Sequence, residues 1–219
     1  MNKLIALLAL GVCFSNVSAK SPKKNKTEEG FVFTTVKENP ITSIKDQNQS
    51  STCWSFSSAA FFESEMLRLG KGEVDLSEMF VVHHTMEERA VNYVRYHGDA
   101  SFSPGGSFED IVACYRQHGL VPQEAMPGIM YGDSLPVHNE LDAVAGAYVE
   151  AIGKGKFSKL TPVWKEGLRS IYDTYLGECP KEFTYKGKTY TPRTFADEVV
   201  GLNMDDYISL TSYTHHPFY

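Results

Sequence analysis

Apolar residues recur at helical spacing after an irregular stretch, residues 41–51, that is rich in Gln, Asn and Ser. Residues 53–69 form the first such run, and Gly70 supplies a typical C-terminal stop. A second helix is expected after a capping box in which Asp75 is the N-cap and Glu78 its partner. The pattern of the first half therefore predicts two consecutive helices.

Further helix signals follow along the chain. Ser107 with Asp110 predicts a helix that ends at Gly119. The apolar periodicity of residues 141–152 predicts another helix. A Thr-Pro pair opens the next one, residues 162–177, because proline is favoured in the first helical position. Helices should therefore dominate the fold.

Strand signals are few and short. Residues 31–36 alternate weakly between apolar and polar, which predicts a short strand. Residues 183–191 predict a hairpin around a Lys-Gly turn, and Pro192 then starts a last short helix. The chain contains no internal repeat and no low-complexity tract, so neither a solenoid nor a fibrous protein is expected.

The first 19 residues have the pattern of a secretory signal. Lys3 gives the positive start, Leu4–Phe14 the apolar run, and Val17–Ala19 a small-residue cleavage site. The run is too short to span a bilayer as a stable helix. We expect cleavage after Ala19 and export to the periplasm or the medium. Lipid attachment at Cys13 is the competing interpretation, and the residue before that cysteine disfavours it.

The rest of the chain divides into a lead-in and one domain-sized region. Residues 20–33 are short, charged and rich in lysine, which predicts a flexible lead-in. Residues 34–219 are long enough to bury a substantial core. The net charge of −6 gives no reason to expect nucleic acid or an anionic membrane as a partner.

Cysteine usage predicts a free thiol. Cleavage after Ala19 would leave Cys53, Cys114 and Cys179, an odd number for an oxidising compartment. Cys53 is the natural free thiol. Cys114 and Cys179 are either paired with each other or simply buried.

Cys53 has the surroundings of a nucleophile rather than those of a small core residue. It opens a predicted helix, where unpaired N–H groups and the helix dipole favour a thiolate. Gln47, six residues earlier, can bring its amide beside the sulfur. That amide and the backbone N–H of Cys53 would hold the negative oxygen of a tetrahedral intermediate. The expected chemistry is thiolate attack, an acyl-enzyme and hydrolysis, without a metal or cofactor.

The stretch from Gln47 to Cys53 and Trp54 resembles the active-site motif of papain-like cysteine peptidases. In that family a glutamine precedes the cysteine by six residues and a tryptophan follows it. The commoner signature has a second cysteine three residues before the nucleophile, where this chain has Ser50. This departure resembles the branch of bleomycin hydrolase and aminopeptidase C, which lacks the corresponding disulfide.

Other segments extend the resemblance over most of the chain. Ser103–Phe108 resembles the double-glycine strip that lines the family's cleft, and Lys188–Phe195 resembles an insertion of this branch. The resemblance implies an α+β fold in which a helical domain faces a β-rich one. Residues 34–130 would form the nucleophile-bearing helical part and residues 131–219 the helical insertion.

The resemblance also implies roles for particular residues. Cys53 would be the nucleophile, Gln47 the oxyanion donor, and Gly105, Gly106 and Trp54 part of the substrate-binding cleft. Glycines let an extended peptide approach the main chain, although an ordinary Pro-Gly loop is the alternative interpretation. The whole enzyme would trim residues from peptide N-termini and assemble as a homo-hexamer.

The sequence offers no obvious base for Cys53. In this family the histidine lies about 130–150 residues beyond the cysteine, and that window, roughly residues 183–203, contains none. His215 and His216 follow later, but they lack the small residue that comes after the family's histidine. We interpret the chain as the N-terminal half of a longer enzyme, without the β-rich domain that carries His and Asn. Alone, it should hydrolyse peptides very poorly.

Other functions are less well supported. A non-catalytic exported protein that binds peptides is the main alternative. Redox chemistry is disfavoured because no Cys-x-x-Cys motif is present. A metal site at His83, His84 and Glu87 is disfavoured because adjacent histidines point to different sides of a helix. Exposed apolar surface is expected where a second domain would dock.

Overall fold

The computed structural model describes residues 31 and 33–210. The predicted leader (residues 1–19), nearly all of the lead-in (residues 20–33), and His215 and His216 therefore lie outside the described residues. The chain divides into two compact units, Met1–Lys37 and Glu38–Tyr219. The elements below all belong to the second unit.

This unit is mainly helical, with one small antiparallel hairpin. The helices are α1 (Cys53–Arg68), α2 (Glu78–Arg95), α3 (Phe108–Gln117), α4 (Asn139–Lys154), α5 (Val163–Leu176) and α6 (Pro192–Phe195), with short turns η1 (Gln123–Ala125), η2 (Ala196–Val200, π-helical) and η3 (Met204–Asp206). The hairpin pairs β1 (Phe183–Tyr185) with β2 (Lys188–Tyr190). The prediction of an α+β protein with mostly helical content is confirmed. Within the described residues, no helix is both long and apolar enough to cross a membrane.

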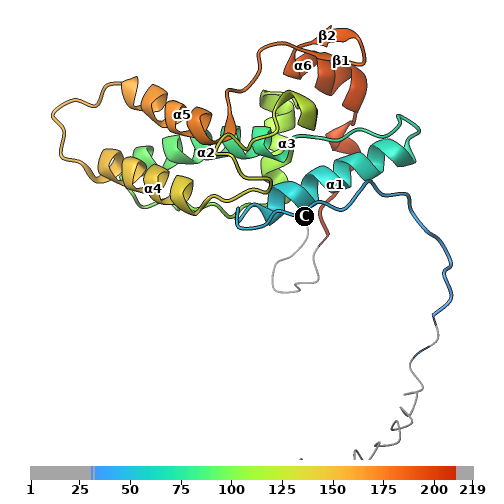
Figure 1. Cartoon of the computed structure of the whole chain (residues 1–219). Helices are drawn as coiled ribbons and strands as arrows, with labels where there is room; N and C mark the ends of the chain where they lie inside the picture. Colours follow the sequence, from blue (N-terminus) through green and yellow to red (C-terminus); the bar gives the residue numbers. More distant parts are fainter. Residues whose placement is uncertain (1–30, 32, 211–219) are drawn as a thin grey trace, which may run out of the picture. The chain divides into compact units, whose positions relative to one another are not determined.

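Helix α2 is the centre of the unit. It contacts α1, α3, α4 and α5, while α4 and α5 also pack on each other (Figure 1). Residues 79–82 of α2 are all buried, and a helix that is apolar all round must have neighbours on every side. Helix α1, which begins at Cys53, packs on α2 and α3 through a face that includes Phe62 and Met66. The site of Cys53 is thus built on the protein's core.

The start of α2 differs from the prediction. The N-cap is Ser77, whose hydroxyl accepts from the N–H of Phe80 at 3.2 Å, so the predicted capping role of Asp75 was wrong. Leu76 forms an isolated antiparallel β-bridge with Pro122. The chain is therefore still extended at Leu76, and the helix begins after it. Asp75 instead forms an ion pair with Lys45.

The helices predicted from Ser107 and over residues 141–152 are confirmed as α3 and α4, whereas Pro162 is the N-cap of α5 rather than its first helical residue. Ser107 and Asp110 form the capping box of α3. The helix ends before Gly119, which has a φ of +86° and no room for a side chain, since a Cβ there would lie 2.2 Å from the carbonyl oxygen of Pro192. Close packing of α6 on the end of α3 therefore requires this glycine.

The strand predicted for residues 31–36 was wrong for those of its residues that the structure describes. Residues 31 and 33–36 have no strand partner, and Phe31, Phe33 and Val36 are almost fully exposed. A weak apolar alternation does not make a strand without a sheet edge to pair with.

Cys114 and Cys179 are unpaired, and of the two only Cys114 is fully buried, while Cys179 is partly exposed. Burial raises the pKa of the Cys114 thiol well above its usual value, and the nearby Cys179 adds to the effect. Burial likewise raises the pKa of Cys179 to about 12. Both thiols are therefore poorly ionised at neutral pH, in contrast to the exposed position of Cys53.

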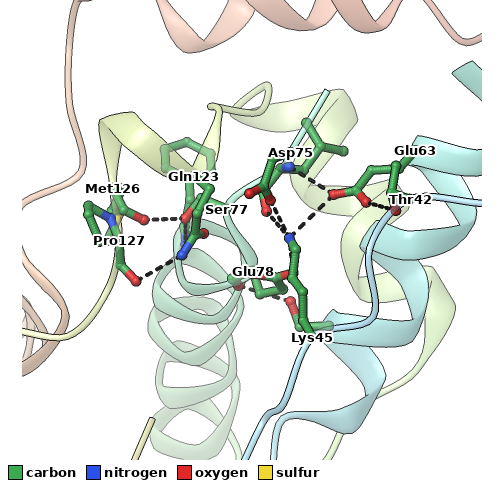
Figure 2. A network of polar contacts seen from close by, with 12 residues as sticks. Thr42, Lys45, Glu63, Asp75, Ser77, Glu78, Gln123, Met126 and Pro127 are labelled. Atoms are coloured by element: carbon green, nitrogen blue, oxygen red, sulfur yellow. Dashed lines mark hydrogen bonds and ion pairs between the residues drawn. The ribbon is translucent and has the colours of Figure 1, made fainter. Parts of the chain in front are cut away.

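A buried ion cluster fixes the loop that leads to α1 (Figure 2). The ammonium of Lys45 donates to Glu78 Oε1 at 2.6 Å, to the carbonyl of Leu76 at 3.1 Å and to Glu63 Oε1 at 3.4 Å. The side chains of Glu63 on α1 and Glu78 on α2 are only 1% and 3% exposed. Glu63 also accepts from the N–H of Leu76 at 2.8 Å. One cation thereby joins the loop, α1 and the start of α2.

The pKa values reflect this competition between burial and pairing. Burial by itself lowers the pKa of Lys45, but the charge of Glu78 and the bonds to Asp75 and Glu78 outweigh it, so the pKa is raised. Burial raises the pKa of Glu78 despite the attraction of Lys45. Ionising Glu78 in the folded protein therefore costs more free energy than ionising it in water, and the charge of Lys45 only partly offsets this cost.

We predict that Lys45→Met lowers the free energy of unfolding by about 3 kcal/mol at pH 7, because it leaves two buried carboxylates without their cation. Chemical denaturation would measure the loss. Lys159→Met, at an exposed position, is the matched control and should change stability by less than about 0.5 kcal/mol. An equally small effect at Lys45 would contradict the structural role of the cluster.

Candidate active site

Cys53 is the first residue of α1 and its side chain is exposed. It lines two hollows of about 410 Å³ and 400 Å³. Gln47 lines the first hollow with it, and Gly106 lines the second. The structure therefore brings together three of the residues that the sequence singled out, and Cys53 is common to both hollows.

The N-terminal N–H groups of α1 are open. Thr52 occupies the N-cap position, but its hydroxyl pairs with Ser50 Oγ at 2.5 Å and makes no capping bond. No hydrogen bond among the described residues uses the N–H of Cys53 or Trp54. The first turn also carries no acidic residue. The positive end of the helix dipole therefore lies beside Cys53 with no acidic side chain in the first turn to compensate it.

The loop before Cys53 stores backbone strain. Asn48 and Ser51 have φ values of 47° and 56°, in the left-handed region that non-glycine residues rarely adopt. Two of the four such residues in the described part of the chain lie here, within five residues of Cys53. The N–H of Asn48 is held by Asp46 Oδ1 at 2.7 Å. Strain of this kind persists only where the surroundings hold the loop firmly.

Those surroundings are supplied by the segment that precedes α4. The N–H of Gln49 donates to the carbonyl of Pro136 at 3.2 Å, and the N–H of His138 donates to the carbonyl of Gln49 at 3.0 Å. Asn139 Nδ2 adds a bond to Gln49 Oε1 at 3.2 Å. The loop before Cys53 therefore has a strand-like partner that lies about 90 residues further along the chain.

His138 supports the same loop as a buried, neutral side chain. It is 1% exposed, and burial lowers its pKa to about 4, against the opposing effect of a hydrogen bond with the backbone of Ser50. Its Nε2 has no hydrogen-bond partner among the described residues. Sequence reasoning gave His138 no role, because nothing in its neighbourhood forms a motif.

The double-glycine strip lies against Trp54. The indole Nε1 donates to the carbonyl of Pro104 at 2.8 Å. A Cβ on Gly106 would lie 2.4 Å from the ring of Trp54, whereas a Cβ on Gly105 would meet nothing within 4 Å. Trp54 is 5% exposed. It therefore supports the strip from beneath, and Gly106 is the glycine that faces the hollow with Cys53.

No histidine that the structure describes lines either hollow beside Cys53. His83 lies between α2 and α5, where its Nε2 is 2.8 Å from Asp173 Oδ1. His84 stacks on His118 with ring centroids 3.9 Å apart, and burial lowers the pKa of His84 to about 3. Among residues 31 and 33–210, no group of three or more His, Cys, Asp or Glu side chains is arranged to hold a metal ion.

Comparison with known proteins agrees with this geometry. Residues 31–125 match the family described as "Papain family cysteine protease". Aminopeptidase C of Streptococcus thermophilus is 21% identical over 224 residues, which cover 86% of this chain and 50% of that protein. The chain thus spans about half the length of the curated relative that it matches. The matched region contains Gln47, Cys53 and Gly106.

We predict that Gly106→Ala destabilises the protein by about 1–3 kcal/mol, because the new methyl group overlaps the Trp54 ring. Gly105→Ala is the matched control one residue away, where space is open, and should cost less than about 0.5 kcal/mol. Thermal or chemical unfolding of the two variants measures the difference. Equal losses would contradict the described packing of the strip.

We also predict a pH effect from His138. Its folded-state pKa of about 4 lies below the ordinary 6.5, so the unfolded chain takes up the proton more readily. The contribution to stability is therefore complete above pH 6.5 and is lost as the pH falls toward 4, by about 3 kcal/mol. In denaturation experiments, the free energy of unfolding of His138→Gln should fall less between pH 7 and 4.5 than that of the wild-type protein. Parallel losses in both proteins would refute this assignment.

Proposed function

We propose that the chain is the nucleophile-bearing half of a cysteine peptidase. The proposal follows from its papain-like character and its resemblance to the aminopeptidase C branch. The observation that carries this proposal is the exposed Cys53 thiol at the open N-terminus of α1, with Gln47 lining the same hollow. An exposed thiol beside free N–H groups is suited to nucleophilic attack on a carbonyl. The buried Cys114 and the partly buried Cys179, whose pKa values are raised, are less suited to it.

The proposed reaction is acyl transfer. The Cys53 thiolate attacks the carbonyl carbon of a peptide bond, and the carbonyl electron pair moves onto oxygen. The N–H of Cys53 and the side-chain amide of Gln47 donate to that oxyanion. The amine leaves with a proton from the base, which leaves a thioester on Cys53. Water then attacks the thioester, releases the acid and restores the thiol.

The base belongs outside the described residues in this proposal. The larger hollow beside Cys53 is bordered by Ile41, Ile44 and Phe56, and Ile41 and Ile44 are 68% and 92% exposed. Apolar surface of this kind is costly to leave in water. We propose that a further polypeptide segment, which carries the histidine and asparagine, covers it. The exposure of Ile41 and Ile44 supports this proposal.

Substrates would be peptides bound in extended form. No hydrogen bond among the described residues uses the N–H or C=O of Gly106, so both can pair with a peptide main chain. N-terminal trimming and assembly as a homo-hexamer are carried over as proposals for the whole protein. Export, with cleavage after Ala19, is likewise part of the proposal.

A second candidate function is peptide binding without cleavage. The observation that favours it is the absence of a histidine from both hollows in the described part of the chain. Such a protein would have kept the loop and the strip but would have no proton donor for the leaving amine.

A peptide aldehyde tests the proposal directly on the 219-residue chain. The aldehyde should add to Cys53 as a hemithioacetal, whose oxygen takes the place of the oxyanion. Gln47→Ala should weaken this binding about tenfold, because one donor to that oxygen is lost. Gln117→Ala, at an exposed position on α3, is the matched control and should have no effect. Isothermal titration calorimetry measures the affinity of the wild-type chain, Gln47→Ala and Gln117→Ala for the aldehyde.

The outcomes separate the two functions. Binding that survives Cys53→Ala undiminished, with no hemithioacetal detected by NMR, would favour peptide binding alone. Turnover of an aminoacyl substrate by the chain itself, abolished in Cys53→Ala, would contradict an external base. His215 or His216 would then become the candidate.

A further inference from the structure

Three consecutive carbonyls of the strip are held by side chains. Arg89 Nη1 donates to the carbonyls of Ser103, at 3.0 Å, and of Gly105. The carbonyl between them, on Pro104, accepts from Trp54 Nε1 at 2.8 Å. The peptide planes of residues 103–105 are thereby turned toward α1 and α2.

Arg89 is joined to every element around the strip. It projects from α2, its Nη2 donates to Asp110 Oδ2 on α3 at 2.8 Å, and its Cζ lies 5.6 Å from the ring centroid of Trp54 on α1. The same Asp110 oxygen accepts from the N–H of Ser107 at 2.7 Å. One guanidinium thus fixes both ends of the segment that contains Gly106.

This arrangement decides which main-chain groups face the hollow. Gly106 is the first residue of the strip whose N–H and C=O have no partner among the described residues. Hydrogen bonds weaken steeply away from linear geometry, so a peptide can pair with Gly106 only if the preceding planes hold it in orientation. No disulfide performs this task here, because Ser50 stands before Cys53 and the cysteines that the structure describes are free.

We propose that Arg89 is the positioning residue of the substrate-binding wall. It orients the N–H and C=O of Gly106 for main-chain pairing with a peptide seated at Cys53. This inference rests on the proposed function of the cleft. A lysine cannot replace it, because a single ammonium does not reproduce the planar fork that reaches two carbonyls and a carboxylate together.

The test compares two alkylating probes on the full 219-residue chain. A dipeptidyl chloromethyl ketone needs the wall for recognition, whereas iodoacetamide reports only the reactivity of the thiol. For Arg89→Met, the concentration giving half-maximal inactivation by the peptidyl probe should rise about tenfold or more. The limiting rate and the iodoacetamide rate should stay within about twofold. Arg89→Lys should resemble Arg89→Met.

Arg95→Met is the matched control, since Arg95 lies on the same helix, is exposed, and forms no side-chain hydrogen bond or ion pair with the described residues. Hydrogen exchange across residues 99–107 supplies a second measurement, which should accelerate in Arg89→Met only. Unchanged exchange, or faster exchange with undiminished recognition of the peptidyl probe, would overturn the proposal.

A different result is expected if the proposed peptidase function is wrong. In that case the wild-type chain would show no saturable recognition of the peptidyl probe, and the role of Arg89 in binding would be overturned with it. The exchange measurement would still decide whether Arg89 holds the strip.

Discussion

The position of the whole site depends on the ammonium of Lys45, which lies between the carboxylates of Glu63 and Glu78. Burying these two carboxylates is costly without a cation beside them, and the hydrogen bonds of Lys45 link both helices to the loop that carries Gln47. A buried ion pair contributes little net stability compared with apolar packing, but it tolerates only one arrangement of its partners. In this protein that arrangement sets the relation of the nucleophile loop to α1 and α2.

Two basic side chains act in similar ways on the two borders of the cleft. Lys45 binds the Leu76 carbonyl and carboxylates from two helices, and Arg89 binds two carbonyls and Asp110. Both side chains hold irregular backbone segments in fixed positions, although these segments do not belong to a regular sheet. This explains how a site built largely from loops can be held firmly: the loops hydrogen-bond to side chains that themselves project from rigid helices.

The sequence predicted the long helices because apolar periodicity and glycine stops are local signals. It also singled out Cys53 and Gln47 as candidate site residues, because their spacing is a motif. It could not identify Arg89 or His138, since their partners lie at Gly105 and Ser50, and contacts over such separations leave no local pattern. The cap of α2 was misplaced for a related reason. Asp75 has the residue type of an N-cap, but its ion pair with Lys45 and the extended chain at Leu76 overrode local preference.

The hydrogen bond between Ser50 and Thr52 has a consequence for the environments in which the site can work. A loop closed by a disulfide loosens under the same reducing conditions that keep a catalytic thiol active. Here the loop is closed by hydroxyl and backbone hydrogen bonds, which reductants do not touch. Oxidants, in turn, meet one exposed sulfur, Cys53, while the other described thiols are shielded and un-ionised. The redox state of the surroundings can therefore act on Cys53 and leave the hydrogen bonds that hold its loop unchanged.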